Sequence, residues 1–184
     1  VSRLLHAIGD FERIGDHAIN IQDSARELQD KELHFSPTAE KELKVLGAAL
    51  EDILSQAVSS FNQDDPAAAK AVEPLEETID QLTEEIRMRH IQRLQTGECT
   101  IQLGFVLNDL LTNLERVSDH CSNIAVCLVQ VNEDEFDTHA YLDELRQEDN
   151  LDFQGKVMAC REKYQLPPTK QDRVMEKNAK LLAE

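Results

Sequence analysis

The chain has 184 residues, of which 41% are hydrophobic and only 4% aromatic, and it contains no Trp. Its 36 acidic and 19 basic residues give a formal net charge of -17. Nucleic acids and anionic membrane surfaces repel such a chain, so we exclude nucleic acid as a partner and expect cations instead. Abundant Leu, Ala, Glu and Gln favour helices over strands, which predicts an all-α protein.

The cysteines and the hydropathy pattern bear on location. No Cys-x-x-Cys pair and no zinc-ligand spacing is present among Cys99, Cys121, Cys127 and Cys160. Reduced thiols are typical of an intracellular compartment. No stretch approaches the roughly 18 uninterrupted apolar residues of a membrane-spanning helix. We therefore expect a cytoplasmic protein.

The N-terminal third of the chain predicts two long helices. Apolar side chains recur every three or four residues over about 2–29, which places them along one side of a helix. Ser36-Pro37 then indicates a second helix start, because Ser caps helices well and Pro suits the first turn. The apolar stripe of this second helix continues to about Phe61.

Two more long helices follow. Asp65-Pro66 repeats the start signal and opens a third helix, and Gly97 favours the left-handed turn that ends it. The fourth helix covers about 101–131, where eight apolar residues lie along a single seam. Short connections join helices that are antiparallel neighbours, so we expect an antiparallel bundle over residues 1–131.

The remaining residues, 132–184, differ in composition and predict an acidic tail with short helices. The tail opens with Glu133-Asp134-Glu135. Helical pieces are expected near 138–147 and 151–165, and Pro167-Pro168 stops the second of them.

The first and fourth helices carry the same polar pattern. Residues 12–21 read ERIGDHAINI, and residues 115–124 read ERVSDHCSNI. The two segments are 103 residues apart and agree at six of ten positions, namely Glu, Arg, Asp, His, Asn and Ile. Because apolar spacing alone does not dictate the polar residues between the apolar ones, an internal duplication is the simplest explanation.

The repeated carboxylates suggest a metal site. Glu12 and Asp16 lie one helical turn apart on one side of the first helix, and Glu115 and Asp119 do the same on the fourth. Two such carboxylates can share a hard or borderline cation such as calcium, magnesium, manganese or iron. A tight site needs further oxygen ligands from a neighbouring helix.

The third helix carries a candidate for these additional ligands. Glu76 and Asp80 have the same spacing and flank its apolar stripe. They would converge on Glu115 and Asp119 if the third and fourth helices pack side by side.

The alternative is that these carboxylates are ordinary surface charges, which is the usual meaning of a single Glu-x-x-x-Asp pair. The duplication favours metal binding over this alternative. His17 and His120 point about 100° away from the preceding Asp and are interpreted as surface groups or supports rather than ligands. Arg13 and Arg116 are expected to form salt bridges between helices.

These strings resemble the PhoU family, whose domains contain two three-helix bundles that each end in an ERIGD helix. The resemblance implies residues 1–29 as the last helix of an incomplete first repeat and residues 36–131 as the second repeat. It also implies metal clusters of iron or zinc, with Glu12, Asp16, Glu115 and Asp119 as ligands and Glu76 and Asp80 in support. The first cluster would lack its partner helix unless another chain supplied it.

The tail is similar to the end of bacterial sodium/phosphate cotransporters, which carry a PhoU-like domain after their membrane segments. The resemblance therefore implies a non-enzymatic regulatory domain at the inner face of the cell membrane. Expected partners are a second copy, the membrane domain of a transporter, or a phosphate-signalling protein. A free-standing PhoU-type regulator of phosphate uptake is the alternative within the family.

The residues alone also bear on two further classes of protein. A ferritin-like di-iron oxidase needs Glu-x-x-His, but Gly15 and Ser118 stand three residues after Glu12 and Glu115. This class is therefore disfavoured. A purely structural helical bundle used for dimerisation explains the apolar seams but leaves the repeated polar string without a role.

Overall fold

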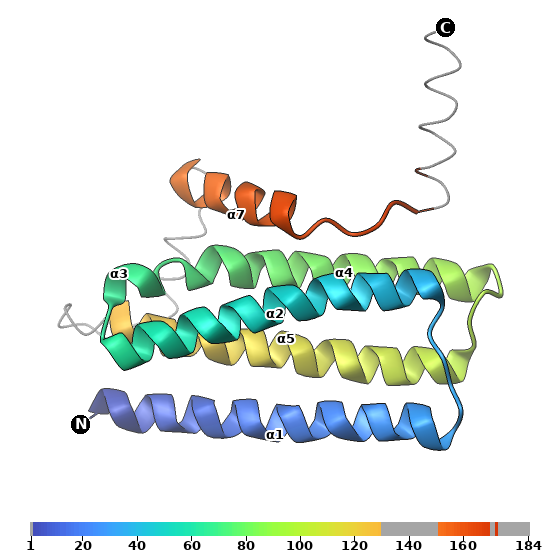
Figure 1. Ribbon diagram of the computed structural model, residues 1–184, viewed down its shortest axis with the longest axis horizontal. Coiled ribbons are helices and arrows are strands. Elements are labelled where there is room, and N and C mark those ends of the chain that lie inside the picture. Colours follow the sequence, from blue (N-terminus) through green and yellow to red (C-terminus); the bar gives the residue numbers. More distant parts are fainter. Residues whose placement is uncertain (1, 130–150, 170–171, 173–184) are drawn as a thin grey trace, which may run out of the picture.

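The computed structural model describes residues 2–129, 151–169 and 172, and their regular structure is entirely helical (Figure 1). The predicted all-α bundle is thus confirmed. The predicted helix near 138–147 lies outside the described residues. The helices are α1 (Ser2–Asp30), α2 (Pro37–Gln63), α3 (Pro66–Ala69), α4 (Val72–Gln95), α5 (Ile101–Val129) and α7 (Leu151–Lys163).

Local start signals set the helix boundaries. Ser36 has extended backbone angles, and its hydroxyl oxygen accepts a hydrogen bond from the backbone N–H of Ala39. Pro37 follows as the first helical residue. At the other end of α2, Asp64 adopts a left-handed conformation with φ 53°, which ends the helix.

The predicted third helix is broken into α3 and α4. Asp65 caps α3 by accepting from the N–H groups of Ala67 and Ala68, as its start signal predicts. The chain leaves the helical path at Lys70 and Ala71 and resumes at Val72. Pro74 explains the break, because a proline ring inside a continuous helix would clash with the carbonyl of Lys70. The break places Pro74 in the first turn of α4, where a missing N–H costs nothing.

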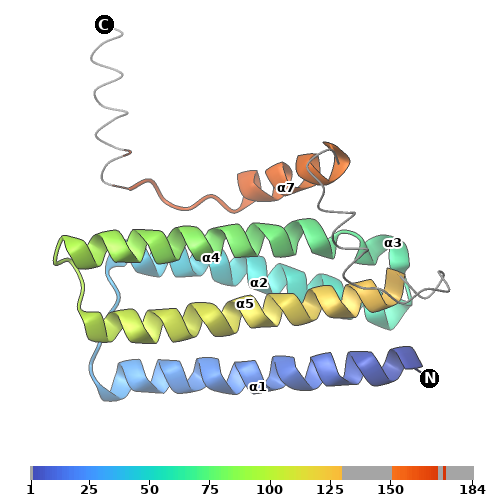
Figure 2. The same ribbon diagram turned by 180° about the vertical axis from the view of Figure 1, so that it is seen from behind.

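Helices α2, α4 and α5 form a three-helix bundle, and α1 lies antiparallel along α5 (Figures 1 and 2). The core of the bundle is aliphatic. Its largest fully buried apolar side chains are Leu46, Ile53, Leu75, Ile79, Leu82, Ile86, Leu107, Leu111, Ile124 and Leu128. None of the described helices has the length and continuous hydrophobicity needed to cross a membrane.

The predicted seam is mostly buried on α5, where Leu110 and Leu114 are only partly buried, and it is less buried on α1. On α5, Cys121 and Leu128 are fully buried, whereas the equivalent Ala18 and Ala25 of α1 are exposed. Other apolar residues of α1 also face solvent: Leu5 is 66% exposed, and Ile8 and Ile19 are each 58% exposed. Helix α1 therefore presents a partly apolar outer side.

The tail helix α7 packs against α4 (Figure 1). Phe153 and Val157 of α7 and the following Tyr164 are buried. Lys163 Nζ lies 2.5 Å from Asp52 Oδ2 on α2, and the Tyr164 hydroxyl donates to the same carboxylate. These hydrogen bonds from Lys163 and Tyr164 hold the pKa of Asp52 below its usual value. The tail thus contacts both α4 and α2.

Candidate metal centre

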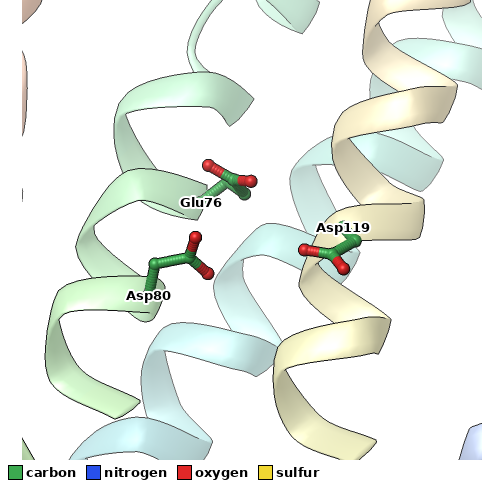
Figure 3. A group of neighbouring side chains, drawn as sticks. All are labelled: Glu76, Asp80 and Asp119. Atoms are coloured by element: carbon green, nitrogen blue, oxygen red, sulfur yellow. The ribbon is translucent and has the colours of Figure 1, made fainter. Parts of the chain in front are cut away.

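Three carboxylates meet between α4 and α5 (Figure 3). Glu76 and Asp80 of α4 and Asp119 of α5 each offer one oxygen, and these oxygens all lie within 4.8 Å of one another. Figure 3 shows the carboxyl groups of the two α4 residues directed toward α5, and that of Asp119 directed toward α4. Glu76 is 5% exposed, and the two aspartates are half-buried.

The packing of α4 on α5 creates this cluster. Leu75, Ile79 and Leu82 bury one side of α4 in the core. Glu76 and Asp80 each follow one of these core positions by a single residue, so they project at the edge of the buried stripe. At that edge they meet Asp119, and the expected convergence of the third and fourth helices occurs at this residue.

The cluster has the chemistry of a hard-cation site. All three groups are carboxylates, which suit magnesium, calcium, manganese and iron. Negative charges this close repel one another strongly in a partly buried place. A bound cation would offset that repulsion, with the carboxylates of Glu76, Asp80 and Asp119 as its ligands.

Glu115 does not belong to this cluster. Its Oε2 lies 3.2 Å from Nη2 of Arg87 on α4, and Nη1 of the same arginine lies 2.9 Å from Glu84. Burial tends to lower the pKa of Arg87, but the hydrogen bonds to Glu84 and Glu115 outweigh it and raise the pKa. The guanidinium therefore stays charged and holds Glu115 in an ion pair.

Among the described residues, Arg116 competes with a cation for Asp119. Its Oδ2 accepts from Arg116 Nη1 at 2.9 Å, a pair within α5 in which the Arg116 side chain is 61% exposed. The expectation that Arg116 bridges two helices is therefore wrong. Such an exposed pair contributes little stability, so Asp119 can exchange Arg116 for a cation at small cost.

Glu12 and Asp16 are placed differently from their counterparts. Both are exposed on α1, whose main packing partner is α5. Among the described residues they belong to no group of three carboxylates with converging oxygens. The structure thus brings together Glu76, Asp80 and Asp119, and leaves Glu12, Asp16 and Glu115 outside the cluster.

The repeated His and Asn residues have a role that the sequence interpretation missed. They form the contact between α1 and α5. His17 Nδ1 lies 2.8 Å from Asn113 Oδ1, and His120 Nδ1 lies 2.9 Å from Asp10 Oδ1. The two imidazole rings stack with centroids 5.6 Å apart.

The asparagines complete the same pattern. Asn20 donates to Asn113 Oδ1 at 3.0 Å, and Asn123 donates to Asp10 Oδ1 at 3.2 Å. Asp10 and Asn113 are themselves 103 residues apart, so each of these His and Asn contacts occurs twice with the two repeats exchanged. The two helices are therefore related by a local two-fold axis near the stacked histidines. The sequence did contain a signal for this contact: the repeat continues upstream to the equivalent positions Asp10 and Asn113.

Comparison with known proteins agrees with this geometry. Residues 43–128, which cover α4, most of α2 and nearly all of α5, match the family model of the PhoU domain. The chain is therefore similar to PhoU domains over this range. The carboxylates of Glu76, Asp80 and Asp119 all lie inside the matched range.

Two similar proteins extend the comparison beyond the matched range. The Phosphate-specific transport system accessory protein PhoU homolog 1 of Thermotoga maritima is 28% identical over 121 residues, which are 66% of this chain and 51% of the relative. The PhoU homolog of Deinococcus radiodurans is 24% identical over 127 residues, or 68% and 57% of the two chains. The chain thus spans about half the length of these curated relatives. No solved structure is significantly similar.

Proposed function

We propose that this chain is a non-enzymatic regulatory module of inorganic phosphate transport that binds a metal ion through Glu76, Asp80 and Asp119. The observation that carries the proposal is the convergence of three carboxylates from two helices within the range that is similar to PhoU domains. The names of both relatives, accessory proteins of a phosphate-specific transport system, support the regulatory part. The metal would act by tying α4 to α5.

The donor set narrows the choice of metal. Iron and zinc are the ions that the family resemblance implies. The three converging groups supply only carboxylate oxygens, and neither His nor Cys belongs to the cluster. Oxygen ligands suit iron and manganese, whereas structural zinc sites rely on Cys and His. We therefore propose iron as the physiological ion, with manganese as a close substitute.

Glu12 and Asp16 would form a second half-site. They have the helical spacing of Glu115 and Asp119 but need carboxylates from a further helix. We propose that another copy of the chain or another segment of the protein supplies these ligands. A transporter membrane domain remains the proposed partner at the inner face of the cell membrane.

Thermal unfolding with added metal tests the metal site. A cation that binds only the folded state raises its stability, by about 2.7 kcal/mol at a hundredfold excess over Kd. We expect Fe²⁺ or Mn²⁺ to raise the Tm of the wild-type chain. The double variant Glu76→Gln, Asp80→Asn should lose this rise and be at least as stable without metal, because like charges are removed.

A matched control separates a specific site from general acidity. Asp23 and Glu27 are also acidic residues one turn apart, and they pair only with Arg26 and Lys31 on the surface of α1 among the described residues. The variant Asp23→Asn, Glu27→Gln should keep the full metal response. If this variant and the Glu76/Asp80 variant respond equally, the metal site is refuted.

A helical dimerisation bundle is a second candidate, favoured by the apolar outer side of α1. Leu5, Ile8 and Ile19 are all more than half exposed there. Sedimentation equilibrium distinguishes the two roles. A dimer that forms without metal, and that Ile8→Glu together with Ile19→Glu dissociates, would support the structural role.

A further inference from the structure

A pocket of about 620 Å³ lies where α2 begins and α4 ends, far along α4 from the carboxylate cluster. Its wall combines three segments that are distant in sequence. Ser36 and Thr38 come from the start of α2, Arg89 and Arg93 from the last turns of α4, and Thr169 from the segment after α7. The pocket falls within the usual size range of small-molecule sites.

A buried carboxylate holds the two arginines in place behind this pocket. Glu42 of α2 is fully buried, and its Oε1 accepts from Arg89 Nη1 at 3.2 Å and from Arg93 Nη1 at 3.1 Å. Arg89 also donates to Glu85 at 2.7 Å and to the backbone carbonyl of Pro167 at 2.6 Å. Arg89 is thus largely satisfied by the protein itself.

One guanidinium nitrogen of Arg93 has no hydrogen-bond acceptor among the described residues. The residue is only 9% exposed, and its Nη2 atom is buried without a hydrogen-bond partner among the described residues. A buried guanidinium nitrogen without an acceptor is unfavourable, so it favours an anion that can accept from it. Arg93 lines the pocket and pairs through Nη1 with Glu42 Oε2 at 2.8 Å, so an anion in the pocket would reach the buried Nη2 after a small shift of the guanidinium.

Charged groups of both signs surround the pocket. Arg161 Nη2 lies 2.7 Å from Glu85 and extends the network of Glu42, Arg89 and Arg93. Arg89, Arg93 and Arg161 face the carboxylates of Glu42, Glu85 and Glu98 and that of Asp172, which accepts from the Thr169 hydroxyl at 2.7 Å, so the surroundings are not positive overall. Glu98 stands exposed on the rim and adds a carboxylate there.

The start of α2 adds a further attraction for anions. The helix has 27 residues. Pro37 has no N–H, Ala39 donates to Ser36 Oγ and Glu40 donates to the Ser36 carbonyl, so Thr38 is the first-turn residue whose N–H has no acceptor within the helix. The positive end of the helix dipole therefore points toward the pocket that Ser36, Pro37 and Thr38 line. Hydroxyl groups of Ser and Thr and buried guanidinium groups are suited to phosphate oxygens.

We propose that this pocket binds a phosphate-bearing small molecule, with Arg93 and the first turn of α2 contacting the phosphate group. The pocket exceeds the volume of one inorganic phosphate ion, so a phosphate ester such as a nucleoside monophosphate also fits. Inorganic phosphate and the ester share the same recognition chemistry. Because Arg89 holds the Pro167 carbonyl, an occupied pocket would also secure the segment after α7.

Isothermal titration calorimetry on the whole chain tests this proposal at fixed ionic strength. Inorganic phosphate, AMP and sulfate are titrated separately. We expect phosphate, AMP or both to bind, and sulfate shows whether the pocket also accepts other tetrahedral anions. Stronger binding of AMP than of inorganic phosphate assigns the pocket to a phosphate ester, and the reverse order assigns it to the free ion.

Three variants locate the binding. Gln92→Glu places a negative charge on an exposed lining residue without touching the buried network, and it should weaken binding at least tenfold. Arg93→Gln should also abolish binding. Because it disturbs Glu42, it is used only if circular dichroism shows a folded chain. Glu98→Gln removes the rim charge and should tighten binding several-fold.

The matched control is Arg26→Gln, which removes a positive charge from the exposed surface of α1 and should bind as the wild type does. Absence of phosphate and AMP binding up to ~10 mM ligand overturns the proposal, as does unchanged binding by Gln92→Glu. The outcome is independent of the metal site, because the Glu76→Gln, Asp80→Asn variant should keep its affinity for phosphate.

Discussion

Helices α1 and α5 carry the same ten-residue polar string but occupy very different surroundings. Helix α5 packs against α1, α2 and α4, whereas α1 packs mainly against α5. As a result, Asp119 meets two carboxylates of α4, while the equivalent Asp16 faces solvent. The comparison shows that a repeated motif supplies the ligands, but the neighbouring helices decide whether a site forms.

The largest difference between the two helices is expected in their cores. Leu111 of α5 is fully buried, and Ile8, its counterpart on α1, is 58% exposed. Leu111→Ala should lower the free energy of unfolding by about 2–5 kcal/mol, because it leaves a cavity, whereas Ile8→Ala should change it by less than about 1 kcal/mol. Urea denaturation measures both. Equal losses would mean that another copy covers α1 in solution.

The next difference concerns metal binding at the two aspartates. At a metal concentration of a hundredfold Kd, Asp119→Asn should lose about 2.7 kcal/mol of metal-induced stabilisation, and Asp16→Asn should retain it. Metal titrations followed by thermal unfolding provide the measurement, with a chelator-treated sample as the baseline. A loss on Asp16→Asn as large as that on Asp119→Asn would place a second metal on α1.

The two-fold contact between the helices is not fully symmetric, because Asp10 of α1 corresponds to Asn113 of α5. A double-mutant cycle on His120 and Asp10 should give a coupling of about 1.5–3 kcal/mol, since one partner is a carboxylate. The equivalent cycle on His17 and Asn113 should give only about 0.5–1.5 kcal/mol. Reversal of this order would contradict the geometry described for the two histidines.

The smallest effect, on chemical reactivity rather than stability, is expected at one more pair of equivalent positions. Cys121 of α5 is fully buried, while Ala18 of α1 is exposed. Iodoacetamide should label Cys121 slowly, whereas a cysteine introduced by Ala18→Cys should react at least tenfold faster. Mass spectrometry of timed samples reads both rates. Slow labelling at position 18 would indicate that something covers this side of α1.

Much of the fold could be predicted from local signals in the sequence. Ser36-Pro37 and Asp65-Pro66 mark helix starts because capping and proline geometry depend on only a few neighbouring residues. The break before Pro74 followed from the same chemistry, but the continuous apolar stripe of the third helix concealed it. The repeat itself was visible because its polar residues recur at a fixed separation.

The candidate site was predictable only in part, because its assembly depends on how helices pack. The spacing of Glu76 and Asp80 predicted that both side chains lie on one side of α4. Their proximity to Asp119 depends in addition on the packing of α4 against α5. The pairing of Glu115 with Arg87 could not be read from the sequence, since 28 residues separate them. The phosphate pocket was equally hidden, because its residues come from three distant segments.

The exchange symmetry between α1 and α5 has a consequence for the origin of the chain. In such an interface, every contact between two residues has a second copy in which the equivalent residues of the two halves have changed places. This pattern is called isologous, and two identical subunits make it around a two-fold axis. Duplication and fusion would have turned such a homodimer contact into an intramolecular one. Once both halves belonged to one polypeptide, the residues at positions 10 and 113 could diverge independently into Asp10 and Asn113. The two halves could then also diverge in function.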